Sequence, residues 1–208
     1  MGFLQELKQQ RWDDHRYYHH NRINQSLHLF SACCFLVSYA LVFESPVIAA
    51  FCGWVLAMTS RQVGHFFFEP KGFDAPNQVT HEYKEEIKVG YNLNRKVVLL
   101  TIWALIPIVL VINPSLFGWI TPHDSTAAYI YNVSVLWIWL GMAAIAFRSI
   151  QLFFLSGITT GLAWATKILT DPFHDIWLYH KAPIRALKGD LYDPIVGESI
   201  DEHDPQHA

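Results

Sequence analysis

The chain has 208 residues, of which 52% are hydrophobic and 15% aromatic, while only 16% carry a charge and the formal net charge is −3. A chain with this much apolar surface is not disordered. Its negative net charge excludes a strongly basic nucleic-acid binder, so no nucleic-acid partner is expected. All three cysteines lie inside apolar stretches, which excludes a disulfide scaffold. Eleven histidines and eight tryptophans in such a chain indicate a membrane protein that binds a metal.

Two apolar segments follow a polar N-terminal segment, residues 1–26, which contains a cluster of histidines. Between Leu27 and Ser60 the only charged residue is Glu44, at a position where Ser45-Pro46 favours a turn. A helix needs roughly 20 apolar residues to cross a bilayer core about 30 Å thick. We therefore predict a helical hairpin over residues 27–68, with spans Leu27–Phe43 and Pro46–Phe68.

A second pair of apolar segments follows a polar loop, residues 69–96. No Asp, Glu, Lys or Arg occurs from Val97 to His123 or from Ser125 to Phe147. We predict a second helical pair over residues 97–147, with spans Val97–Phe117 and Ala127–Phe147. For residues 148–188 we expect a re-entrant or interfacial segment whose helix is Ser149–Thr166, and for residues 189–208 an acidic, mobile tail.

Lys and Arg are distributed unevenly among these segments: four precede the first span, six lie between the second and third, none between the third and fourth, and five after the fourth. Because basic residues collect on the cytoplasmic side, four spans place all fifteen there, whereas a fifth span through Ser149–Thr166 would move four of them across. The sequence therefore predicts an all-α fold. We expect one polytopic membrane helical bundle of about four spans plus a re-entrant or interfacial helix, in a bacterial inner membrane or the endoplasmic reticulum.

The predicted topology brings most of the histidines to the cytoplasmic boundary of the membrane. His28 on the first span and His65 on the second lie at the same predicted depth on adjacent antiparallel helices. A histidine within lipid is costly unless it faces the bundle interior or binds something. We therefore expect His28 and His65 to bind one metal ion at this boundary.

The spacing of the polar residues before the first span limits which histidines can bind the same ion. On a continuous helix His20, Asn24 and His28 would share one face, whereas His19 would point nearly opposite to His28. His19 and His28 can bind one ion only if the helix breaks between them, and the asparagines of this segment, Asn21 and Asn24, favour such a break.

The second predicted span ends in a matching pattern. His65 and Glu69 would share one helical face, and Gly64 would allow another helix to approach closely. Imidazoles with one carboxylate suit iron, zinc or another first-row metal. Glu69 could instead accept a hydrogen bond from a ligand imidazole and fix its tautomer.

At these residues the chain is similar to a known family. Tyr18-His19-His20-Asn21 with Asn24 and His28, followed by Gly64-His65-Phe66-Phe67-Phe68-Glu69, resembles the integral-membrane 2-hydroxy-fatty-acid dioxygenases, a former domain of unknown function that includes the fungal phytosphingosine-degradation enzymes and bacterial relatives. The resemblance covers roughly residues 15–75. It implies a small helical membrane protein that uses Fe(II) and O₂ to remove one carbon from a 2-hydroxy fatty acid, a fatty acid α-oxidation.

The resemblance also implies roles for individual residues. His19, His28 and His65 would form the metal-binding core, and His20, Asn24 and Glu69 would be ligands or groups that support the ligands. We expect Arg61, one turn before His65, to bind the substrate carboxylate, with contact to lipid phosphate as the alternative. Further metal-ligand candidates are His81 and His174, whereas no metal role is expected for His203 and His207 in the tail.

One departure from the family pattern concerns the substrate. After the second motif, relatives often carry a charged residue and then a Pro-Ala pair, whereas this chain has Pro70-Lys71-Gly72-Phe73-Asp74-Ala75-Pro76. The loop that follows is also longer, so the preferred substrate can differ from that of the relatives. The expected partners remain a 2-hydroxy fatty acid, O₂ and membrane lipid.

Other functions remain open at this point. A di-iron membrane fatty acid hydroxylase or desaturase would need many histidines, but such enzymes usually carry an HxxHH-type run, which this sequence lacks. A non-enzymatic metal or haem carrier, or a small transporter, is a further alternative. The histidines gather at one boundary and no two halves repeat each other, which disfavours the transporter.

Overall fold

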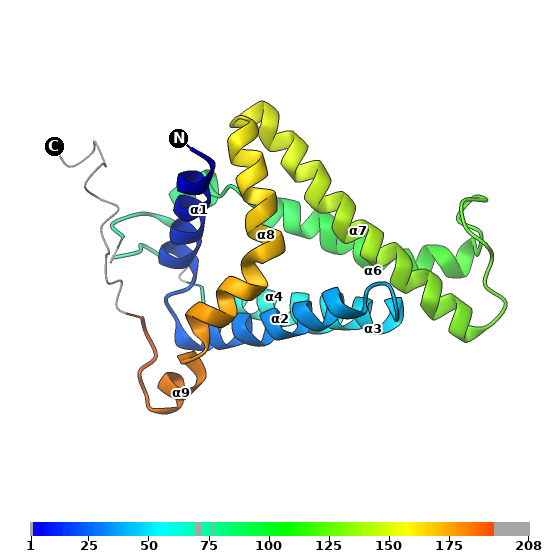
Figure 1. Ribbon diagram of the computed structural model, residues 1–208, viewed down its shortest axis with the longest axis horizontal. Coiled ribbons are helices and arrows are strands. Elements are labelled where there is room, and N and C mark those ends of the chain that lie inside the picture. Colours follow the sequence, from blue (N-terminus) through cyan, green and yellow to red (C-terminus); the bar gives the residue numbers. More distant parts are fainter. Residues whose placement is uncertain (1, 70–71, 76, 194–208) are drawn as a thin grey trace.

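The structure is a computed structural model that describes residues 2–69, 72–75 and 77–193. The described chain is helical, as predicted, and within it the extended backbone forms only isolated β-bridges. The elements, shown in Figure 1, are α1 Phe3–Tyr18, α2 Arg22–Leu41, α3 Pro46–Ala50, the π-helix η1 Phe51–Met58, α4 Thr59–Phe67, α5 His81–Ile87, α6 Leu93–Ile112, α7 Thr126–Leu155, α8 Ile158–Tyr179 and α9 Ala182–Leu187.

The predicted helical hairpin is present. Elements α3, η1 and α4 follow one another without interruption from Pro46 to Phe67 and pack along α2. Ser38 on α2 donates a hydrogen bond of 2.8 Å to the carbonyl oxygen of Ala49, and Gly53 lies against the same serine. Helix α2 begins at Arg22, five residues before the predicted span, because Asn21 caps it there.

Three tryptophans join this hairpin to the second helical pair. The indole of Trp54 on η1 donates to the carbonyl oxygen of Trp137 on α7 at 2.7 Å, and the indole of Trp137 donates to that of Trp103 on α6 at 3.0 Å. The rings of Trp103 and Trp137 also stack, with centroids 5.1 Å apart. The indole N–H groups of Trp54 and Trp137 therefore each have a partner on a neighbouring helix.

The boundaries of the second pair differ from those predicted. Helix α6 ends at Ile112, before the predicted end at Phe117, since the chain turns from Asn113 onward. Helix α7 continues past the predicted end at Phe147 to Leu155. The prediction ended the span before Arg148 because this residue is charged. In the structure its guanidinium donates to the carbonyl oxygen of Val89, so the side chain is accommodated within a continuous helix.

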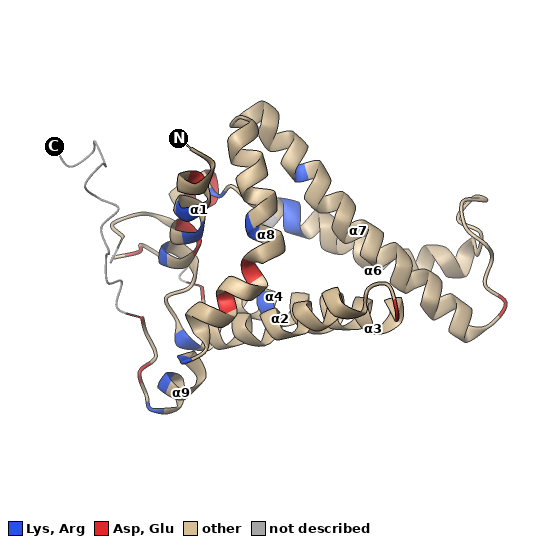
Figure 2. Ribbon diagram, viewed as in Figure 1, with Lys and Arg blue, Asp and Glu red and all other residues tan. Residues whose placement is uncertain are grey.

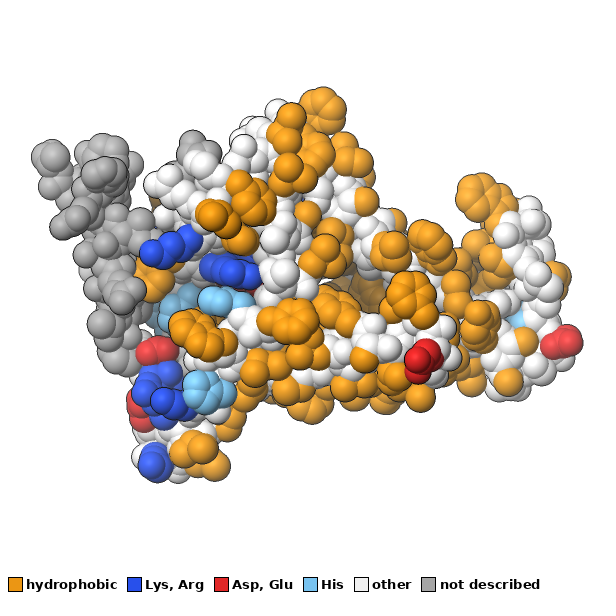
Figure 3. All heavy atoms as spheres, viewed as in Figure 1, with side chains coloured by type: hydrophobic (Ala, Val, Ile, Leu, Met, Phe, Trp, Pro, Cys, Tyr) orange, Lys and Arg blue, Asp and Glu red, His pale blue; other side chains and the backbone are white. Residues whose placement is uncertain are grey.

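In the part of the chain that the structure describes, three helical stretches are long and apolar enough to cross a membrane: Pro46–Phe67, Asn94–Ile112 and Thr126–Leu155. Figure 2 shows few charged residues on α6 and α7, and Figure 3 shows hydrophobic side chains over much of the same region. These helices indicate a membrane protein. Helix α2 is less apolar because polar side chains, among them Asn24, Gln25 and His28, occupy its first two turns.

Helix α8 crosses the hairpin and packs against α1, α2 and α7 (Figure 1). The expected helix Ser149–Thr166 is not one element, because its first part ends α7 and its second part begins α8. Gly157 between them has φ 96°, a left-handed conformation that turns the chain. A Cβ on Gly161 would lie 2.7 Å from the carbonyl oxygen of Ser149, so glycine is also required where the two helices meet.

The first residues of the predicted mobile tail are held in place. The carboxylate of Asp193 accepts two hydrogen bonds of 2.9 Å from the guanidinium of Arg22, and its N–H donates to the carbonyl oxygen of His20. The segment before it pairs with the start of α2, since Arg22 N–H donates to Leu191. The remaining tail, with His203 and His207, lies outside the described residues.

Candidate metal centre

The helix breaks between His19 and His28, as a shared metal ion would require. Helix α1 ends at Tyr18, and Asn21 begins α2 by accepting hydrogen bonds from the N–H groups of Ile23 at 2.8 Å and Asn24 at 3.4 Å. This capped break turns the two imidazoles toward each other, so that their Nε2 atoms lie 3.2 Å apart. The prediction of a break at the asparagines is confirmed.

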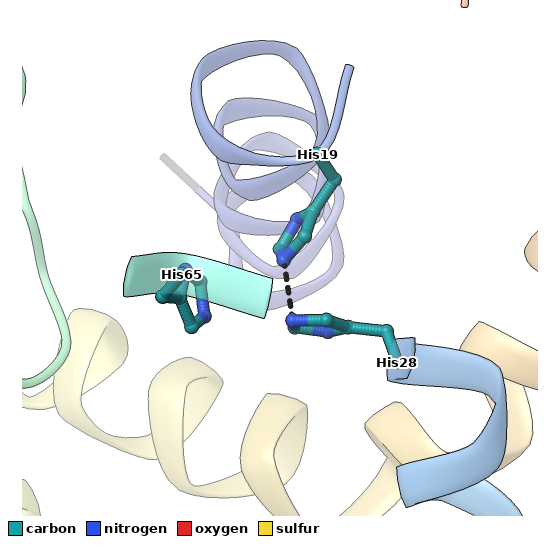
Figure 4. A group of neighbouring side chains, drawn as sticks. All are labelled: His19, His28 and His65. Carbon is teal, nitrogen blue, oxygen red and sulfur yellow. Dashed lines mark hydrogen bonds between the residues drawn. The ribbon is translucent and has the colours of Figure 1, made fainter. Parts of the chain in front are cut away.

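Gly64 brings the third histidine to the same point. A Cβ at Gly64 would lie 2.1 Å from Oδ1 of Asn24, so only glycine allows α4 to approach α2 this closely. The ring of His65 consequently has its centroid 5.0 Å from that of His28 and 5.3 Å from that of His19. Figure 4 shows the three imidazoles converging, and their ligand atoms lie within 4.8 Å of one another.

The second nitrogen of each ring faces an acceptor. Nδ1 of His19 lies 2.8 Å from the carbonyl oxygen of Asp14, and Nδ1 of His65 lies 2.7 Å from the carboxylate of Glu69. Because these oxygens can only accept, Nδ1 carries the proton in both rings and Nε2 keeps its lone pair. Nδ1 of His28 stands 4.0 Å from the carboxylate of Asp175. Such acceptors behind a ligand ring are typical of histidines that bind metals through Nε2.

His19 and His28 have the spacing of two ligands on one metal ion. Two nitrogens bound to one first-row ion at about 2.0–2.1 Å lie roughly 3.0–3.4 Å apart, and the Nε2 atoms of His19 and His28 are separated by 3.2 Å. Both rings are 1% exposed. Burial lowers the pKa of His19 well below its ordinary value, although Asp14 opposes this shift, so the imidazole is neutral, the form that binds metals.

Several predicted site residues lie elsewhere. The ring of His20 contacts the carbonyl oxygen of Arg16 and lies 3.8 Å from the carboxylate of Asp74, outside the group of three. The other two metal-ligand candidates, His81 at the start of α5 and His174 stacked on Trp177, are not in this group either.

Asn24 and Arg61 are close to the histidines but have protein partners of their own. The amide of Asn24 donates to the carbonyl oxygen of Tyr18 at 2.8 Å and packs against Gly64, which makes it part of the helix junction. The guanidinium of Arg61 donates to the carboxylate of Asp175 at 2.5 Å. Arg61 is therefore neither directed to lipid nor free for a substrate carboxylate in this structure.

Sequence reasoning missed the contribution of α8. Lys167 pairs with Asp14 at 3.0 Å and with Asp171 at 2.6 Å, and Asp175 lies one turn further along, beside Arg61 and His28. Burial disfavours the charge on Lys167, but the two carboxylates outweigh it and hold its pKa above its ordinary value. The signal in the sequence was charge at positions i, i+4 and i+8 of an otherwise apolar helix.

A cavity of about 480 Å³ adjoins this group of histidines, and His65 is one of its lining residues. This volume is within the range of about 300–1,000 Å³ that is typical of small-molecule sites. Much of its wall is apolar and includes Phe35, Trp54, Leu99 and Ile145, contributed by α2, η1, α6 and α7. The site therefore combines a buried group of imidazoles with space for an apolar ligand.

In comparisons with protein-family models, with curated proteins and with solved structures, nothing matched this chain. The resemblance to the 2-hydroxy-fatty-acid dioxygenases therefore remains a prediction from the sequence motifs.

Proposed function

We propose that the protein is a membrane-bound, Fe(II)-dependent dioxygenase that shortens 2-hydroxy fatty acids by one carbon. The observation that carries this proposal is the convergence of three imidazole nitrogens, from His19, His28 and His65, beside a cavity with apolar walls. The proposed reaction balances without a further reductant: the 2-hydroxy acid and O₂ yield the acid one carbon shorter, CO₂ and water.

The chemistry of the donor set supports iron and a hydroxy acid. Three neutral imidazoles suit a first-row ion such as Fe(II), and they leave its charge available to an anionic hydroxy-carboxylate. When bound, the ion would supply redox chemistry toward O₂. Glu69 and the carbonyl of Asp14 hold the protons of His65 and His19 on Nδ1, and so keep both Nε2 atoms available.

The packing supports a four-span arrangement in the membrane. Helix α2 lies along the apolar segment Pro46–Phe67, so a bilayer that contains one of them surrounds the other as well. With α6 and α7 this makes four spans, and the loop between α6 and α7 has no Lys or Arg. We therefore propose that the metal centre lies at the cytoplasmic boundary of a bacterial inner membrane or the endoplasmic reticulum.

The test pairs metal analysis with the reaction. Purified protein is loaded with Fe(II) under anaerobic conditions, and O₂ uptake and products are then followed with 2-hydroxyhexadecanoic acid and with hexadecanoic acid. We expect pentadecanoic acid from the hydroxy acid only, and we expect His28→Ala to lose both iron and activity. The exposed His180→Ala serves as the matched control and should retain both.

The same experiment separates the competing functions. Two irons per chain, with hydroxylation or desaturation of hexadecanoic acid, would place the protein among the di-iron enzymes. Metal retention without O₂ uptake on any hydroxy acid would make it a metal carrier. Either result would overturn the dioxygenase proposal.

A further inference from the structure

Four cationic side chains line the cavity, and three of them are neutralised by carboxylates of the protein. Arg61 pairs with Asp175. Lys88 lies 3.1 Å from Glu85 and 3.7 Å from Glu69. Lys167 lies between Asp14 and Asp171. These pairs leave no uncompensated positive charge for a ligand at the three positions.

Lys96 is the fourth cation, and its ammonium group has no ion pair with a described carboxylate. Among the residues that the structure describes, no carboxylate lies within ion-pair distance of Lys96 and no acceptor receives a hydrogen bond from it. An unpaired ammonium in a cavity wall is unfavourable until an anion accompanies it. Lys96 also lies in the first turn of α6, where the helix dipole favours a negative charge.

The walls around Lys96 change from polar to apolar in one direction. On α6, Lys96 is followed one turn later by Leu99, and both line the cavity. Residues of α4 and η1 also line the cavity, where the chain passes backward from His65 through Met58 to Trp54. Lys96 and His65 thus belong to the polar end, whereas Trp54 lies at the apolar end, near Gly141 of α7.

We infer that Lys96 binds the carboxylate of a single-chain fatty acid whose hydrocarbon chain extends along the cavity toward Trp54. This inference rests on the proposed function in that the occupant belongs to the class of its substrate. The residue that binds the substrate carboxylate is then Lys96 and not Arg61, because Arg61 already has Asp175 as its partner.

The test measures binding without iron and without reaction. A fluorescent long-chain fatty acid is bound to the metal-free, full-length protein in detergent, and hexadecanoic acid or hexadecan-1-ol is used to displace it. We expect the acid to bind about tenfold or more tightly than the alcohol. Lys96→Met should abolish this preference, whereas Lys96→Arg should keep it. Lys181→Met, at an exposed position outside the cavity, should have no effect.

Two further measurements keep the inference open to refutation. Lys96→Met removes an unpaired charge, so the ligand-free variant should unfold at the same temperature as the wild type or higher. If the variant nevertheless fails to fold, the carboxyl-¹³C signal of hexadecanoic acid bound to wild-type protein decides: it should remain that of the carboxylate at a pH where the free acid in detergent is protonated. An unchanged preference in Lys96→Met, or a protonated bound acid, overturns the inference.

The experiments distinguish a wrong assignment of Lys96 from a wrong proposed function. If hexadecanoic acid binds through Lys96 but no hydroxy acid is oxidised, the inference stands and the dioxygenase proposal falls. If hydroxy acids are shortened but Lys96→Met leaves both acid binding and KM unchanged, the reverse holds.

Discussion

The Cα of Gly64 lies so close to the amide of Asn24 that a methyl group at position 64 would stand 2.1 Å from Asn24 Oδ1. This contact sets the distance between α4 and α2, and therefore the distance between His65 and the other two histidines. The convergence of the three histidines thus depends on the absence of one side chain.

Gly64→Ala should separate α4 from α2 and weaken the site. We expect a loss of about 1–3 kcal/mol in stability, typical of overpacking, and a clear loss of bound iron. Thermal unfolding and metal analysis measure the two effects. Gly141→Ala is the matched control, because its Cβ would meet the ring of Trp54 at an ordinary 3.7 Å. Equal iron content in both variants would contradict this explanation.

Asn21→Ala should remove the cap that fixes the break between α1 and α2. Loss of an N-cap costs about 0.5–2 kcal/mol, and here it should also lower iron affinity because His19 and His28 lie on either side of the break. Ser125→Ala, which removes the N-cap of α7, should cost similar stability without changing iron affinity. The prediction fails if the two variants bind iron equally well.

Glu69→Ala should leave Nδ1 of His65 without its acceptor. Removing such a partner typically lowers metal affinity about 10–100-fold, and iron titration measures the change. Glu85→Ala is the control, since Glu85 also pairs with Lys88, whereas the acceptor for His65 is Glu69. A similar loss of iron affinity in both variants would show that the loss arises from Lys88, which both glutamates contact, and not from His65.

The four-span arrangement predicts that the loop between α6 and α7 and the segment after α8 lie on opposite sides of the membrane. Single cysteines at His123→Cys and Lys181→Cys, in a background without Cys33, Cys34 and Cys52, should react with a membrane-impermeant reagent from opposite sides. Labelling of both from one side would exclude this topology, including the proposal that α2 spans the membrane.

The convergence of His19, His28 and His65 could be predicted because local geometry constrains it. Helical periodicity alone shows that His19 and His28 cannot face each other on one continuous helix, and Asn21 supplies the cap at the required break. Gly64, directly before His65, likewise indicates from the sequence alone that another helix approaches closely there. These residues lie on two consecutive helices, so little of the tertiary structure has to be known.

The supporting residues of α8 could not be predicted in the same way. Asp175 reaches His28 and Arg61 only after α6 and α7 have turned the chain back, and no local pattern specifies that contact. The end of α7 was missed for a related reason. Arg148 marks the end of an apolar run in sequence, but the carbonyl of Val89, far away along the chain, accepts its hydrogen bonds and lets the helix continue.

The contact between Asp193 and Arg22 has a consequence for biosynthesis. Arg22 begins α2, three residues after His19, yet its carboxylate partner is among the last described residues that the ribosome makes. The junction that bears His19 and His28 is therefore completed only after α6, α7 and α8 have been made. All three histidines are thus made well before the contact that holds this junction in place.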